Sequence, residues 1–172
     1  KNNIKLLIAA DGGAGSGKTT GSKLIAKKYG FKLLTSGLLY RFIAYKLLKT
    51  KKIKSKNLVL KKITRKITSK DLKNRNLFGT EVTKYTSEIA KIKRIRDLLK
   101  SYQINFAKNR LCIIEGRDIG TVVIPKADLK LFFKCSINTK AKRRFEEYRK
   151  TNKKISFNDV KKAIKLRDSN DS

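Results

Sequence analysis

The chain has 172 residues, and its hydrophobic content of 40% is enough for one domain with a sizeable core. Its 45 lysine and arginine residues against 13 acidic residues give a formal net charge of +32, which raises the question of a nucleic-acid or membrane partner. These basic residues are spread through almost every segment, so we expect most to cover solvated faces and some to bind anionic substrates. Histidine is absent, which excludes imidazole-based triads, metal sites and acid–base catalysis.

An apolar run at residues 4–10 is typical of a strand and leads into a glycine-rich loop. Gly12, Gly17, Lys18 and Thr19 fit the pattern G-x-x-x-x-G-K-S/T. The backbone N–H groups of such a loop form an anion-binding concavity, and the helix that follows points its positive end at the same place. Lys18 is then expected to reach the β- and γ-phosphates of a nucleotide, and the Thr19 hydroxyl to help hold Mg²⁺. The alternative is a flexible glycine turn without a ligand.

Hydrophobic periodicity predicts that strands and helices alternate after this loop. Strands are expected at residues 31–34, 111–114 and 129–133, of which the last two are apolar enough to be buried. Helices are expected at residues 18–29, 39–47, 80–91 (capped by Thr80), 92–106, 138–150 and 157–164. The segment 49–76 has only a weak helical pattern, so we expect a small mobile or peripheral element there. The alternation predicts a parallel α/β sheet with helices on both faces.

Charged residues follow two of the predicted strands or begin helices. Glu115 ends an apolar strand, and an acid at such a place beside a phosphate loop often holds the hydration shell of Mg²⁺, although it can also be an ordinary strand-end carboxylate. Arginine grips phosphate with a planar fork, and phosphoryl transfer needs positioning and charge neutralisation rather than a histidine base. The candidate arginines are Arg41, Arg96, Arg117, Arg143 and Arg144. The last two also fit an ordinary solvated helix.

The two cysteines, Cys112 and Cys135, stand in separate apolar stretches and are expected to be small core residues. Isolated thiols fit a reducing compartment, and the run at 4–10 is too short for a membrane span and lacks a signal-peptide layout. These features predict a soluble cytoplasmic protein. The chain starts at Lys1 and stops just after a helical pattern, so we expect it to be a fragment.

Four stretches together indicate a family: IAADGGAGSGKTT at 8–20, LLTSGLLYR at 33–41, EGRDIGTVVIP at 115–125 and KRRF…IKLRDSND at 142–171. The phosphate loop is shared by many enzymes, whereas the combination of SGxxYR with GRDxGTVVxP is much more specific. With these stretches the chain resembles the bacterial cytidylate kinases, which belong to the nucleoside monophosphate kinase group of P-loop proteins.

The resemblance implies a three-layer α/β sandwich with a central parallel sheet. It also implies a single kinase domain over residues 1–172, with a shortened monophosphate-binding insert at 49–80 and a helical lid at about 139–156. The family's final strand and helix are expected to be missing. The activity implied is transfer of the γ-phosphoryl group of ATP to CMP or dCMP with Mg²⁺, by a monomer that needs neither a specific nucleic acid nor a membrane.

The resemblance also assigns roles to residues that match the family's motifs. The implied ATP-binding residues are Gly12, Gly13, Ala14, Gly15, Ser16, Gly17, Lys18, Thr19 and Thr20. The implied CMP-binding residues are Ser36, Arg41 and Arg117 at the phosphate, Ser87, Arg96 and Asp118 at the cytosine, and Arg167 and Asp171 near the ribose. The implied catalytic residues are Lys18, Arg41, Arg117, Arg143 and Arg144, and those for Mg²⁺, directly or through water, are Thr19 and Glu115.

The chain departs from the family pattern at several positions. Thr35 and Glu115 stand where the family usually has aspartate, and Thr19 stands where many members have glycine. The insert lacks the pattern of a small sheet, and an arginine common near Phe78 is missing. Two other functions stay open at this point: a kinase of the same fold with a different small-molecule or monophosphate acceptor, and a nucleic-acid-binding protein on a P-loop scaffold.

Overall fold

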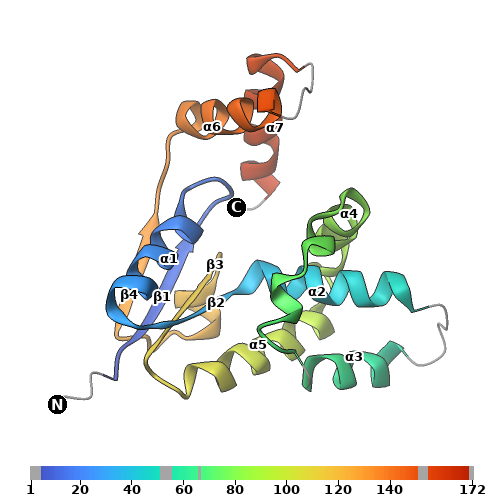
Figure 1. The fold of residues 1–172 in the computed structure, drawn as a ribbon, viewed down its shortest axis with the longest axis vertical. Coiled ribbons are helices and arrows are strands. Elements are labelled where there is room, and N and C mark those ends of the chain that lie inside the picture. Colours follow the sequence, from blue (N-terminus) through green and yellow to red (C-terminus); the bar gives the residue numbers. More distant parts are fainter. Residues whose placement is uncertain (1–4, 51–55, 66, 151–154, 171–172) are drawn as a thin grey trace.

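A computed structural model describes residues 5–50, 56–65, 67–150 and 155–170 (Figure 1). Its centre is a parallel sheet of four strands in the order β2-β3-β1-β4. The strands are β1 (Leu7–Gly12), β2 (Lys32–Thr35), β3 (Cys112–Gly116) and β4 (Leu129–Phe133). Every residue of β1 and β3 is buried, because these strands have a neighbour on each side and helices on both faces.

The strand β4 corrects one prediction, since it is not a buried strand. Leu129 is 42% exposed and Phe132 is 65% exposed. Among the described strands β4 lies at the edge of the sheet and pairs only with β1, so fewer neighbours cover it.

Helices cover both faces of the sheet, which confirms the predicted three-layer α/β architecture (Figure 1). Helix α1 (Lys18–Tyr29) packs Ile25 and Ala26 on Ile8, Ala10 and Ile113. The larger core on the other face joins alternate strand residues to α2 (Ser36–Lys49) and α5 (Lys93–Ala107). As predicted, α1 ends at Gly30, which adopts a left-handed conformation with φ of 72°.

The segment between α2 and α5 is more firmly packed than its sequence predicts. It contains α3 (Lys56–Arg65), two 3₁₀ turns, η2 (Asp71–Lys73) and η3 (Arg75–Phe78), and α4 (Thr80–Ile89). Leu60 is buried in the main core and Thr64 is also buried, so the expectation of a peripheral element is wrong for the described part of 49–76. The predicted cap is also wrong, because Thr80 is the first helical residue and Gly79 occupies the N-cap.

Two helices, α6 (Ile137–Lys150) and α7 (Phe157–Asn170), pack against each other beyond the end of the sheet where β4 leads into α6 (Figure 1). Their contact buries Ala141 and Val160 and stacks Phe145 edge-on against Phe157, with ring centroids 5.8 Å apart. None of the helices in the described part of the chain is long and apolar enough to cross a membrane. Of the two cysteines, Cys112 is a core residue as predicted, whereas the other is only half-buried.

Candidate active site

The loop between β1 and α1 has the geometry of a phosphate cradle. Gly12 has φ of 155°, and a Cβ there would lie 2.5 Å from the carbonyl oxygen of Phe133, so only glycine fits. Gly17 has φ of 89° and forms the N-cap of α1. The Lys18 ammonium donates to the Gly13 carbonyl oxygen at 3.4 Å and so folds back over the loop. The positive end of α1 and the Lys18 charge therefore meet at one place.

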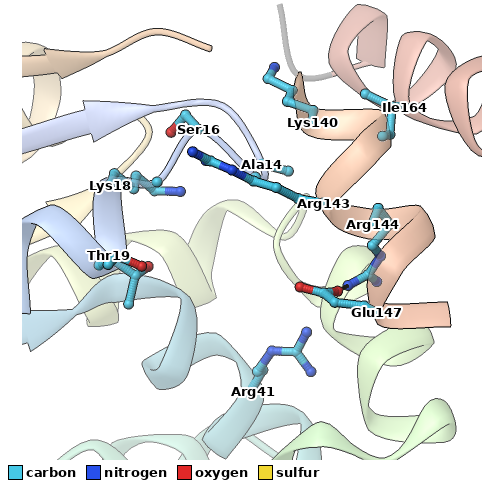
Figure 2. Close-up of a pocket in the computed structure, with 13 residues that line it drawn as sticks. Ala14, Ser16, Lys18, Thr19, Arg41, Lys140, Arg143, Arg144, Glu147 and Ile164 are labelled. Carbon is cyan, nitrogen blue, oxygen red and sulfur yellow. Dashed lines mark hydrogen bonds and ion pairs between the residues drawn. The ribbon is translucent and has the colours of Figure 1, made fainter. Parts of the chain in front are cut away.

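An open cavity of about 380 Å³ lies between this loop and α6 (Figure 2). Its wall brings together three parts of the chain that are distant in sequence: the loop, helix α2 and the helical pair. Figure 2 shows Arg143 extended from α6 towards the loop, and its Nη1 atom lies 3.5 Å from the position that a Cβ on Gly17 would occupy. The cavity is lined by Ala14, Gly15, Ser16, Gly17, Lys18, Thr19, Thr20, Arg41, Lys140, Arg143, Arg144, Glu147 and Ile164. Five cations against one carboxylate make the cavity suited to an anion.

Thr19 and Glu115 connect the loop to the end of β3. The Thr19 hydroxyl donates to Oε1 of Glu115 at 3.0 Å. Glu115 is only 1% exposed, and its Oε2 atom has no hydrogen-bond partner among the described residues. A buried carboxylate oxygen without a partner is costly unless a cation or water meets it. The hydroxyl and carboxylate oxygens fit Mg²⁺, which takes few protein ligands and completes its shell with phosphates and water.

Arg41 is positioned by the segment that follows α3. Its Nη1 atom donates to the Leu77 carbonyl oxygen at 2.9 Å and to the Thr83 hydroxyl at 2.8 Å. The ring of Phe78 lies under the guanidinium, with 5.2 Å between Cζ and the ring centroid. These contacts hold the half-buried guanidinium at the wall of the cavity that faces Lys18 (Figure 2).

A second group of predicted residues lies where β2 and β3 end. Ser36 begins α2 directly after β2, and Asp118 follows β3, its neighbour in the sheet. Arg96 of α5 donates to Asp118 Oδ2 at 2.9 Å. Tyr40 lies beside this pair: burial raises the pKa of its phenol, Arg96 lowers that pKa, and Asp118 raises it. The pair and the phenol offer charged and polar groups for a nucleobase edge.

The remaining predicted residues do not line the cavity or are not fully described. Gly12 and Gly13 belong to the loop but do not line the cavity. Arg117 is exposed after β3, and Ser87 is exposed on α4. Arg167 lies in α7 with its side chain not described, and Asp171 lies outside the described residues.

Sequence reasoning missed several residues that shape the site. Lys140 and Glu147 both line the cavity from α6, one turn before and one turn after the two predicted arginines, and that helical spacing could have identified them. Glu147 pairs with Arg144 at 2.8 Å. Asp11 was also missed: its carboxylate accepts from the backbone N–H groups of Ile119 and Gly120. It stands directly before the glycine loop, but no local pattern predicts so distant a partner.

Comparison with known protein families matches residues 8–172 to the family described as cytidylate kinase. The chain belongs to the cytidylate kinase family. Among curated relatives of that name, the cytidylate kinase of Fusobacterium nucleatum subsp. nucleatum is 34% identical over 97% of this chain and 81% of its own length. That of Pseudothermotoga lettingae is 36% identical, with 98% of this chain and 79% of the relative covered. That of Thermosipho melanesiensis is 38% identical, with 96% and 80% covered.

Family membership confirms the resemblance carried by the four sequence stretches. The matching family and the relatives named above are described as cytidylate kinases. They therefore do not favour either alternative, a kinase with a different acceptor or a nucleic-acid-binding protein.

Proposed function

We propose that this protein transfers the γ-phosphoryl group of ATP to CMP or dCMP, giving ADP and CDP or dCDP. The observation that carries the proposal is the cavity where the phosphate loop, Arg41 and the cations of α6 converge in a member of the cytidylate kinase family. In this proposal the protein acts in pyrimidine nucleotide metabolism, as a cytoplasmic monomer whose partners are ATP and the monophosphate.

The donor occupies the loop side of the cavity. Backbone N–H groups of residues 12–20 surround the phosphates of ATP, and the N-terminus of α1 adds its positive dipole. Lys18 lies along the transferring phosphoryl group and neutralises charge on the β- and γ-phosphates. Thr19 and Glu115 would hold Mg²⁺, which would supply positive charge beside the phosphates of bound ATP.

The acceptor occupies the side built by α2, α5 and the segment after β3. Ser36, Arg41 and Arg117 bind its phosphate. Arg96 and Asp118, already paired at 2.9 Å, rearrange around the cytosine edge together with Ser87 on α4. A carboxylate accepts from the exocyclic amino group of cytosine, and a guanidinium donates to its ring edge. The acceptor phosphate is ionised at neutral pH, so its oxygen attacks the γ-phosphorus without a histidine base.

The helical pair acts as a lid. Arg143 and Arg144 come from α6, on the far side of the cavity from the loop. They bring positive charge to the phosphoryl group during its transfer. A lid at about residues 139–156 excludes water, which would otherwise accept the phosphoryl group. Residues 1–172 form one kinase domain, with the described helices of 49–80 as the monophosphate-binding insert. The family resemblance assigns Arg167 and Asp171 to the ribose; Asp171 lies outside the described residues and the side chain of Arg167 is not described.

A coupled assay of ADP formation tests the proposal. With ATP and Mg²⁺, ADP should form rapidly when CMP or dCMP is added and only at a background rate when neither is present. A clear preference for AMP, GMP or a non-nucleotide acceptor contradicts the proposed substrate class. A filter-binding titration with RNA and DNA complements it, since the proposal expects only weak binding that disappears as salt is raised.

A further inference from the structure

One buried carboxylate links the donor loop to the segment that carries the acceptor-binding residues. Asp11 is the last residue before the glycine of the loop, lies opposite Gly116 in the sheet and is 8% exposed. Its Oδ1 atom accepts from the N–H of Ile119 at 2.8 Å, and its Oδ2 atom accepts from the N–H of Gly120 at 2.7 Å. Both carboxylate oxygens therefore point at consecutive backbone amides 108 and 109 residues further along the chain.

The segment held by Asp11 has an unusual backbone. Residues Ile119–Val123 form a single π-helical turn, a rare conformation that often occurs at functional sites. The first N–H groups of such a turn have no partner within it, so their acceptor is a side chain or water outside the turn. Asp11 provides that acceptor with a full negative charge, which makes both hydrogen bonds stronger than bonds to a neutral oxygen. The fit is tight, since a Cβ on Gly120 would lie 3.2 Å from Asp11 Oδ2 and 3.3 Å from the Cβ of Ala9.

The turn begins immediately after two residues with proposed roles in acceptor binding. Arg117 and Asp118 lie between β3 and the turn, and the carbonyl oxygen of Asp118 accepts from the N–H groups of Val122 and Val123. The position of this carbonyl is therefore fixed by the turn, and the turn is fixed by Asp11. Each Asp11 oxygen accepts a backbone N–H, whereas Oε2 of Glu115 has no hydrogen-bond partner among the described residues.

We propose that Asp11 is a positioning residue for the acceptor site: it fixes the π-helical turn so that Arg117 and Asp118 are placed for CMP before CMP binds. The inference rests on the proposed function for the identity of the acceptor. In this proposal Asp11 acts through the turn and not by binding a substrate itself. Its effect should fall on acceptor binding, because the donor loop is shaped by Gly12 and Gly17 and by the α1 terminus.

The test is the variant Asp11→Asn, which keeps the size of the side chain but replaces one acceptor oxygen with an N–H donor that faces a backbone N–H. We expect KM for CMP to rise about tenfold, while ATP affinity measured without CMP changes by less than about twofold. In an Arg117→Ala/Asp118→Ala background, the same change should raise KM for CMP by less than about threefold, because the groups that Asp11 positions are gone. Equal losses in ATP and CMP binding, or an undiminished effect in that background, would overturn the proposal.

Asp128→Asn is the matched control. Asp128 also accepts a buried-strand N–H, that of Leu7 at 2.7 Å, but it lies at the opposite end of β1 from Asp11. Both variants should lower the melting temperature, and only Asp11→Asn should change KM for CMP. A similar KM change in Asp128→Asn would show a general stability effect and overturn the inference.

Amide hydrogen exchange separates this inference from the proposed function. In the wild-type protein, the amides of Ile119 and Gly120 should be protected, and Asp11→Asn should accelerate exchange in residues 117–124 more than in residues 13–20. Fast exchange at both amides of the wild-type protein would overturn the inference, even if the variant does not fold. Absence of CDP formation by the wild-type protein would instead contradict the proposed function, and the exchange result would still decide the role of Asp11.

Discussion

The hydroxyl of Thr19 donates to Oε1 of Glu115 at 3.0 Å, although the two residues are 96 positions apart in the chain. This bond joins the first turn of α1 to the carboxyl end of β3 and leaves Glu115 Oε2 buried without a partner in the described part of the protein. A buried carboxylate oxygen without a hydrogen-bond partner is suited to a cation or to the hydration water of a cation. We therefore propose this pair of side chains as the place where Mg²⁺ would be held beside the phosphate loop.

Glu115→Gln should weaken the use of Mg²⁺. The amide keeps the size of the side chain and an acceptor for Thr19 but removes the negative charge, so the Mg²⁺ concentration for half-maximal rate should rise about tenfold. The measurement is a Mg²⁺ titration of ADP formation at saturating ATP and CMP. Glu81→Gln, on the exposed first turn of α4, is the control and should leave the titration unchanged.

Thr19→Gly tests the hydroxyl separately from the backbone of the loop. We expect a shift of the Mg²⁺ titration in the same direction, because the variant removes the bond that orients Glu115. If the Mg²⁺ dependence is untouched, the hydroxyl has no role in holding the metal, and the loop acts only through its backbone cradle.

Thr83→Val should reveal how Arg41 is held for the acceptor. Valine has nearly the same shape but no hydroxyl to accept the bond from Arg41 Nη1, so KM for CMP should rise roughly threefold to tenfold, with KM for ATP nearly constant. Thr86→Val on the same helix is the control, since that hydroxyl donates to the Val82 carbonyl oxygen of its own helix. Arg41→Ala should reduce CMP turnover much more than ATP binding, and an unchanged turnover rate would contradict its assignment.

Arg143→Ala should lower kcat by about 100-fold, because a cation directed at the transferring phosphoryl group acts mainly in the transition state. Arg149→Ala is the matched control: Arg149 lies on the same helix, is exposed and does not line the cavity. Steady-state kinetics with ATP and CMP give the comparison. Equal kcat values for the two variants would remove Arg143 from the catalytic residues.

Asp128 should make part of the stability depend on acid pH. The hydrogen bond from the Leu7 N–H, and then the charge of Arg110, lower the pKa of this carboxyl below its usual 3.8. A group with a lowered folded pKa stabilises the protein fully above its unfolded pKa and loses that contribution as pH falls through the folded pKa. Urea unfolding between about pH 5 and pH 2 should therefore show a shallower pH slope for Asp128→Asn than for the wild-type protein. Identical slopes would contradict this assignment.

Local patterns were sufficient for most of the fold. The helix at 18–29 and the strand at 129–133 have the predicted bounds, because a glycine stop and a short apolar run are local features. The burial of β4 could not be predicted in this way, since an apolar run does not reveal whether its strand becomes an edge. The packing of Leu60 and Leu77 was missed for a related reason: their burial depends on α2 and α5, which lie far away in sequence.

In the candidate site, too, some features could be predicted from local sequence and others could not. The phosphate loop follows from its own spacing, and residues 14–20 of it line the cavity. The residues that orient the acceptor side do not follow from local patterns: Thr83 binds Arg41 and Asp11 binds the turn at 119–123, yet both are ordinary residues in their local sequence. Their roles arise only when the folded chain brings segments about 40 to 110 residues apart into contact.

The most direct test follows the phosphoryl group itself. The full chain is incubated with ATP labelled on its γ-phosphate, Mg²⁺ and an equal mixture of CMP, UMP, AMP and GMP, and the labelled products are separated at early times. The proposed function predicts that the label appears in CDP well ahead of the other diphosphates and that little is released as inorganic phosphate. Label that accumulates mainly in another diphosphate, or mainly in inorganic phosphate, would contradict it.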